Sequence, residues 1–126
     1  MTKTFSAVVV LLVLSACGAR AGDRCDNSWM TCEEGGKSAL ICENGFVRQY
    51  ACPGARGCWA VGSNRTYCEF VGSHAGDACP TTLGELGFCR DAQTMLSCRD
   101  GRWTVVDCAG CSARPNENGI DVVTCG

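Results

Sequence analysis

The thirteen cysteines in this chain of 126 residues constrain its fold more than any other feature. Such a density is typical of small disulfide scaffolds, which form in oxidising compartments and rarely in the reducing cytosol. Beyond the N-terminal segment the chain has few large aliphatic residues, so its cores cannot offset chain entropy without cross-links. We therefore expect an exported protein that is held together by disulfides.

The cysteines fall into two sets that follow the same pattern. Each set opens with Gly-Asp-x-Cys, at Gly22 and at Gly76. The first set comprises Cys25, Cys32, Cys42, Cys52, Cys58 and Cys68, and the second comprises Cys79, Cys89, Cys98, Cys108, Cys111 and Cys125. This repetition indicates a duplicated module. We predict one six-cysteine module over residues 22–70, a second over 76–126, and a linker of small residues over 71–75.

The N-terminal segment is typical of an export signal. Lys3 supplies a positive charge, and residues 5–16 are almost wholly apolar. This run is too short to span a bilayer but suits the core of a signal peptide. We predict a signal peptide over residues 1–16.

Two alternative processing sites lie at the end of that segment and just beyond it. Residues 14–17 resemble the lipobox of bacterial lipoproteins, in which the cysteine is acylated and becomes the first residue. Acyl chains on Cys17 would anchor the protein in a membrane, with residues 17–21 as a tether. Ordinary signal peptidase could instead cut before Gly22, giving a secreted protein. We favour the lipobox and a lipid-anchored location in the bacterial cell envelope; either route removes the odd thiol.

Each module contains a hairpin framed by two cysteines, over residues 40–52 and 96–108. Asn-Gly at 44–45 and Asp-Gly at 100–101 are preferred dipeptides of tight hairpin turns, because glycine accepts positive φ. Three strands are expected in each module: residues 38–42, 46–52 and 65–70 in the first, and residues 94–98, 103–108 and 119–125 in the second. The predicted fold class is a small, disulfide-rich, all-β protein with two tandem antiparallel meanders after a signal peptide.

The register of the second hairpin decides where Trp103 points. With a two-residue turn, Cys98 faces Trp103, and the indole joins the apolar face with Leu96. A three-residue loop with a bulge would turn Trp103 to the opposite face, because a one-residue slip flips every side chain. We favour the two-residue turn, which packs better, and a core position for Trp103.

Spacing alone does not choose among the many pairings of six cysteines. The hairpin argument places Cys52 near Cys32, lets Cys58 and Cys68 close the last loop, and leaves Cys25 for Cys42. The same pattern in the second module gives Cys79–Cys98, Cys89–Cys108 and Cys111–Cys125. Three bridges in each module, at about 2–4 kcal/mol each, would be the main source of stability.

Several classes of function find no support in the sequence. The formal net charge is −2 and no basic stripe is present, so we expect no nucleic-acid partner. The Cys-x-x-Cys at 108–111 lacks the second half of a zinc site, and structural disulfides explain it better. His74, the single histidine, falls in the linker and the carboxylates are scattered. We predict a protein that is not an enzyme and has no metal or other cofactor.

Aromatic residues are the remaining candidates for recognition, since an exposed ring can stack on a sugar or anchor a protein partner. Tyr50 and Trp103 fit core positions better. Trp29 and Trp59 lie in the least strand-like segments, where packing and binding are equally good interpretations. They are our predicted binding residues.

The spacing C-x(6–9)-C-x(8–9)-C-x-x-G-x6-C, followed by two more cysteines, resembles six-cysteine modules. Such modules occur in cysteine-rich lipoproteins of predatory and soil bacteria and in small secreted fungal proteins. In fungi they accompany carbohydrate-active domains, so the resemblance implies a ligand such as glycan or cell-wall polymer. A protein-binding module, inhibitor-like or adhesin-like, and a passive envelope protein are the alternatives.

Overall fold

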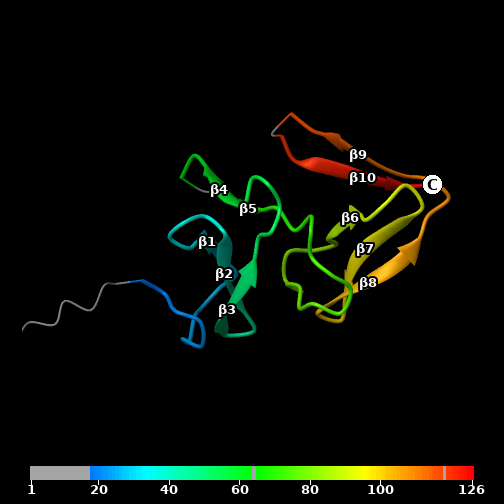
Figure 1. Cartoon of the computed structure of the whole chain (residues 1–126). Helices are drawn as coiled ribbons and strands as arrows, with labels where there is room; N and C mark the ends of the chain where they lie inside the picture. Colours follow the sequence, from blue (N-terminus) through cyan, green and yellow to red (C-terminus); the bar gives the residue numbers. More distant parts are fainter. Residues whose placement is uncertain (1–17, 64, 118) are drawn as a thin grey trace, which may run out of the picture.

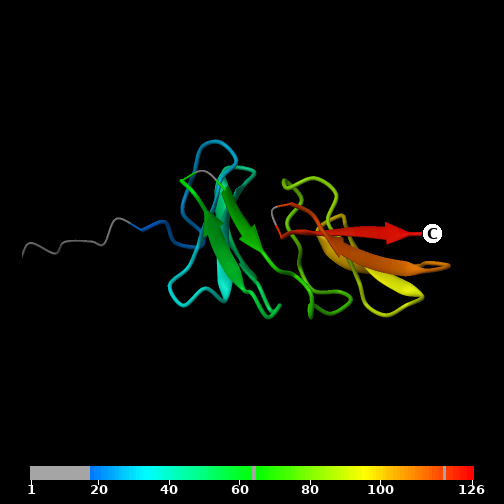
Figure 2. The ribbon, with the colours of Figure 1, turned by 90° about the horizontal axis from the view of Figure 1, so that it is seen from above.

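The computed structural model describes residues 18–126 apart from 64 and 118, and all regular structure in this part is β. The strands form two groups, β1 to β5 and β6 to β10, which lie side by side in both views (Figures 1 and 2). Three disulfides lie within each group. The expected class, a small disulfide-rich all-β protein, is confirmed. The predicted signal peptide, with its lipobox and Cys17, lies outside the described residues.

Each module consists of a three-stranded antiparallel sheet and a two-stranded ribbon. The first module has the sheet β1 (Met30–Cys32), β2 (Ser38–Glu43) and β3 (Phe46–Ala51), and the ribbon β4 (Cys58–Val61) and β5 (Arg65–Cys68). The second has the sheet β6 (Gly87–Cys89), β7 (Thr94–Arg99) and β8 (Arg102–Asp107), and the ribbon β9 (Cys111–Pro115) and β10 (Asp121–Cys125).

The third strand of each sheet differs from the prediction. Residues 65–70 and 119–125 do contain strands, but these pair with β4 and β9 in the ribbons. Each central hairpin takes its third strand from the chain before it, β1 or β6. These strands have three residues each, too few to show the alternation that reveals a strand in a sequence.

Both hairpins have two-residue turns, as predicted for the second. Both turn residues have positive φ in each hairpin, 51° and 85° at 44–45, and 50° and 77° at 100–101. These values define the type I′ turn, whose twist matches that of the strands it joins. Cys98 lies opposite Trp103, so the indole faces the core and only 2% of Trp103 is exposed. The predicted register and burial are therefore confirmed.

One disulfide in each module agrees with the predicted pairing and two do not. Cys25–Cys42 and Cys79–Cys98 are present as expected. The predicted pairs Cys32–Cys52, Cys58–Cys68, Cys89–Cys108 and Cys111–Cys125 are wrong. The structure instead contains Cys32–Cys58, Cys52–Cys68, Cys89–Cys111 and Cys108–Cys125.

The position of β1 explains the different pairing. Cys32 on β1 and Cys52 after β3 lie on opposite sides of β2. Two inter-strand steps separate their backbones by about 10 Å, beyond the roughly 7 Å between Cα atoms that a disulfide can bridge. The ribbon supplies the partners instead, with Cα–Cα distances of 5.5 Å for Cys32–Cys58 and 5.2 Å for Cys52–Cys68. The second module repeats this arrangement around β7.

The two modules bury different kinds of core. In the first, one buried cluster consists of Ala39 with Cys52 and Cys58, so that disulfides provide much of its apolar volume. In the second, Trp103 packs with Phe88, Leu96 and Cys79. The Trp103 and Phe88 rings meet edge to face with their centroids 5.0 Å apart, a favourable aromatic geometry.

Both module entrances fold back on a hairpin. Arg20 and Asp23 close a turn through two hydrogen bonds, and the Gly22 N–H donates to the Val47 carbonyl at 2.7 Å. The predicted tether over 17–21 is therefore shorter, because its end already belongs to the first module. His74, in the predicted linker, and Asp77, in the second module, form the equivalent turn.

Phe70 connects the modules through its packing. It comes directly before the predicted linker, and its ring packs against Trp103 with a centroid separation of 5.5 Å. A residue that follows the last strand of the first module thus completes the core of the second. The modules share apolar surface as well as a chain connection.

Glu43 makes a polar contact between the modules. Only 3% of this residue is exposed. Its carboxylate accepts hydrogen bonds from the Tyr50 hydroxyl and from both the N–H and the hydroxyl of Thr81, the latter at 2.9 Å. Burial alone would raise the pKa of Glu43, but the hydrogen bonds from Tyr50 and Thr81, with Arg48 nearby, hold it below its ordinary value. Burial and the bond to Glu43 raise the pKa of Tyr50.

The disulfide pattern predicts which tryptic peptides stay linked without reduction. Peptide 25–37 should be joined to 38–48 through Cys42 and to 57–65 through Cys58, while 49–56 should be joined only to the peptide that contains Cys68. Mass spectrometry of a non-reduced digest measures this. A link between peptides 25–37 and 49–56 would contradict the structure.

The Glu43 contact predicts acid-dependent stability. Because the pKa of Glu43 is lowered on folding, its contribution is complete above the unfolded value near 4.5 and is lost as pH falls through the folded value. Glu43→Gln should lower the free energy of unfolding by about 1.5–3 kcal/mol at neutral pH, since charged hydrogen bonds are lost. Thermal unfolding followed by circular dichroism measures the difference, which should shrink in strong acid. Glu34→Gln, at an exposed position, is the control; a difference that is independent of pH would argue against this role of Glu43.

Candidate functional site

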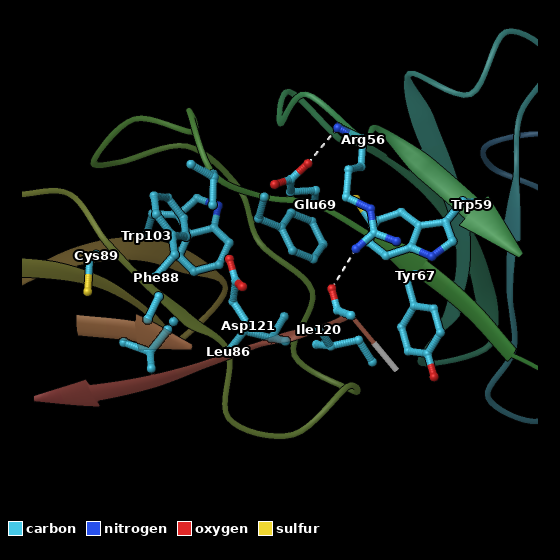
Figure 3. Close-up of a pocket in the computed structure, with 17 residues that line it drawn as sticks. Arg56, Trp59, Tyr67, Glu69, Leu86, Phe88, Cys89, Trp103, Ile120 and Asp121 are labelled. Atoms are coloured by element: carbon cyan, nitrogen blue, oxygen red, sulfur yellow. Dashed lines mark hydrogen bonds between the residues drawn. The ribbon is translucent and has the colours of Figure 1, made fainter. Parts of the chain in front are cut away.

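A cleft of about 370 Å³ lies between the modules (Figure 3). One wall comes from the β4–β5 ribbon, where Trp59 and Tyr67 lie directly opposite each other on neighbouring strands. The other wall comes from the second module and is apolar, with lining residues Leu86, Phe88, Trp103 and Ile120. The mixture of aromatic and aliphatic walls is typical of ligand-binding clefts.

Trp59 is half-buried and is held by two neighbours. The Tyr67 ring lies 5.5 Å away between centroids. The Arg56 guanidinium lies over the indole, 4.0 Å from the ring centroid, in cation–π geometry. The indole Nε1–H is buried and has no hydrogen-bond acceptor among the described residues. The ring is thus fixed in position while one polar group is left unsatisfied.

Arg56 also bridges the two modules at this cleft. Its Nη1 donates a hydrogen bond to the Gly119 carbonyl in the loop between β9 and β10. Its backbone N–H donates to the Glu69 carboxylate at 2.6 Å. Figure 3 shows the guanidinium between the Trp59 ring and the second module. One side chain therefore stacks on the aromatic wall and joins the modules.

Two of the segments that line this cleft differ in length between the repeats. Five residues separate Cys52 from Cys58 but two separate Cys108 from Cys111, and the longer loop contains Arg56. Nine residues separate Cys58 from Cys68 but thirteen separate Cys111 from Cys125. The longer ribbon of the second module provides the lining residues Gly119 and Ile120.

Backbone geometry supports the longer loop of the first module. Gly57 has a φ of +63°, and a Cβ there would lie 2.1 Å from the carbonyl oxygen of Gly36. Only glycine allows this close approach, which lets the loop turn towards the second module. The neighbouring Cys58 N–H donates to the same carbonyl at 2.7 Å.

Charged groups edge the aromatic wall. Glu69 and Asp121 line the cleft together with Arg56. Asp121 begins β10 and lies on the Trp103 side in Figure 3. Rings flanked by carboxylates and a guanidinium suit a ligand that has both apolar faces and hydroxyl groups, because rings cover the former and charged groups bind the latter.

The structure separates the two predicted binding residues. Trp59 lines the cleft described above, whereas Trp29 lines a second cleft of about 400 Å³ beside it. Tyr67 lines both. Tyr50 is buried, as predicted for a core residue.

Neither His74 nor the Cys-x-x-Cys at 108–111 is among the residues that carry the proposed chemistry of this cleft. The His74 side chain is 88% exposed, and its Nδ1 lies 3.6 Å from a carboxylate oxygen of Asp77. Cys108 and Cys111 belong to different disulfides, which confirms the structural interpretation of the Cys-x-x-Cys. In the described part of the chain no group of three or more His, Cys, Asp or Glu side chains is arranged to hold a metal ion.

Sequence reasoning missed Arg56, Phe70 and Ile120. The unequal spacing of the last cysteines was a signal for Arg56 and Ile120, because it marks the loops that depart from the shared framework. Phe70 gives no such signal, since its role depends on how the second module packs against the first.

No family model, curated protein or solved structure matches this chain. Over residues 18–126, leaving aside 64 and 118, the structure contains no helix of the length and apolarity needed to cross a membrane.

The bridging role of Arg56 leads to a prediction about the loop between β9 and β10. Arg56→Ala should lower the free energy of unfolding by about 1–2 kcal/mol, because one hydrogen bond and one cation–π contact are lost. It should also shift the amide NMR signals of residues 119–121. Arg56→Lys keeps the charge but cannot stack a planar group on the indole. Its free energy of unfolding should therefore lie between those of Arg56→Ala and the unaltered protein. Unchanged signals at 119–121 would show that Arg56 does not join the modules.

Proposed function

We propose that this chain is a non-catalytic binding protein of the bacterial cell surface that holds glycan or cell-wall polymer in the cleft between its modules. The observation that carries the proposal is the Trp59–Tyr67 pair, fixed on the β4–β5 ribbon and facing a cleft edged by charged groups. A sugar ring has an apolar face that packs on aromatic rings and hydroxyls that bind charged groups.

The asymmetry of the ribbons supports this assignment. Ser112 and Thr124 lie opposite each other on β9 and β10, where Trp59 and Tyr67 lie on β4 and β5. Both ribbons are held by equivalent disulfides, so large rings are not required for folding at this position. The aromatic pair in the first module therefore favours recognition over packing.

The proposed location rests on the cysteines and on the N-terminal segment. Six disulfides require an oxidising compartment to form and persist. Acylation of Cys17 would hold the first module close to a membrane, because its first hydrogen bonds already involve Arg20. Cleavage before Gly22 would release it as a secreted protein.

The apolar wall favours one alternative function. Leu86, Phe88 and Ile120 line the inner side of the cleft and would receive an apolar side chain from a protein partner. An inhibitor-like or adhesin-like module would use the cleft in this way. A passive structural protein of the envelope would use neither wall.

Retention on insoluble polymers tests the proposal. The protein should be retained on at least one of peptidoglycan, chitin and cellulose. Trp59→Ala should weaken retention at least about tenfold, as expected for loss of a central aromatic contact. Phe46→Ala is the matched control, because Phe46 is 48% exposed and outside both clefts.

Three results would count against this function. No retention on any of the three polymers would show that the protein does not bind them. Equal loss with Phe46→Ala would place the contact elsewhere. Release of soluble sugars from the polymer would contradict the assignment as a non-catalytic protein.

A further inference from the structure

We infer that the two clefts form one groove, and that its ligand is the interior of a linear polysaccharide chain rather than a chain end or a single sugar. This inference rests on the proposed glycan-binding function. It specifies the form of the ligand and adds the second cleft, with Trp29, to the binding site.

The same two chain segments form both clefts. In the first module, residues 65–67 line the second cleft and residues 67–71 line the first. In the second module, Thr82 and Leu83 line the second cleft, and residues 86–89 line the first. Both walls pass from one cleft to the other in the same order. The clefts are therefore neighbouring parts of one groove along the contact between the modules.

The length of the groove suits an extended ligand. Residues 65–71 in extended form span at most about 20 Å, several sugar rings in length. The cleft volumes, about 370 Å³ and 400 Å³, are each sufficient for a small ligand. A chain that enters by one cleft can continue through the other.

Aromatic rings occur along this whole length. Trp29 lines the second cleft, Tyr67 borders both, and Trp59 lines the first. A row of rings recognises a polymer whose apolar faces recur, in the way that successive aromatics recognise successive bases of a single strand. A ligand confined to one cleft would leave Trp29 or Trp59 without a role in binding.

Each cleft is also lined by a residue that carries an unsatisfied polar group. The structure describes three buried side-chain polar atoms without a hydrogen-bond partner, and two of them, Trp59 Nε1 and Thr82 Oγ1, belong to residues that line the first and the second cleft. Such a group destabilises the protein until a water or ligand supplies its hydrogen bond. Sugar hydroxyls can serve both atoms, once small side-chain movements admit them.

Ligand length tests this inference. Isothermal titration calorimetry should compare chitobiose with chitohexaose, and cellobiose with cellohexaose. We expect a hexaose to bind at least about tenfold more tightly than the corresponding biose. Trp59→Ala should weaken the binding of both lengths, whereas Trp29→Ala should weaken only the hexaose.

Thr82→Val separates binding from folding. It removes an unsatisfied hydroxyl, so the thermal unfolding midpoint should stay the same or rise. Affinity for the hexaose should nevertheless fall several-fold, and affinity for the biose should not change. If the hydroxyl had only a structural role, its removal would not lower the affinity for the hexaose while leaving the unfolding midpoint unchanged or higher.

The outcomes distinguish the two proposals. If no oligosaccharide binds and no polymer is retained, the glycan function fails and the groove fails with it. If biose and hexaose bind equally, and Thr82→Val changes neither affinity, glycan binding stands but the ligand occupies one cleft. That result would overturn the extended groove.

Discussion

Each module depends on the two disulfides that tie its ribbon across the outer strands of its sheet. In the first module these bonds join β4 to β1 and β5 to the end of β3. The buried cluster that they enclose contains Ala39 and little other aliphatic volume. Cross-links that restrict the unfolded chain, at about 2–4 kcal/mol each, therefore replace packing that so small a sheet cannot supply. The ribbons are held rigidly as a result, and Trp59 is placed on one of them.

The two modules share a backbone framework but differ in the loops that meet between them. Equivalent backbone hydrogen bonds occur in both modules. The Cys42 N–H donates to the Trp29 carbonyl, and the Cys98 N–H donates to the Leu86 carbonyl, each at 2.9 Å. The last two cysteine intervals differ, and they contain the loops that meet between the modules. Arg56 reaches Gly119 from one of these loops. This part of the contact is thus built from loops whose length differs between the modules.

Local features of this fold could be predicted from the sequence and long-range ones could not. Asn-Gly and Asp-Gly determine the turn geometry, and through it the register and the burial of Trp103. The disulfide partners of Cys32 and Cys52 depend on the position of β1. This strand has three residues, too few to leave a periodic pattern in the sequence. Trp59 was a predicted binding residue, but the opposite wall of its cleft comes from the other module. Only the packing of the modules brings Ile120 and Arg56 to the same cleft.

Phe70, Glu43 and Arg56 hold the two modules as one body with the cleft between them. Backbone ¹⁵N NMR relaxation of the mature chain tests it most directly, because each module reports its own rotational correlation time. We expect one common correlation time for both modules, and two different correlation times when Glu43→Gln is combined with Arg56→Ala. Two different correlation times in the unaltered protein, each that of an independently tumbling module, would contradict it.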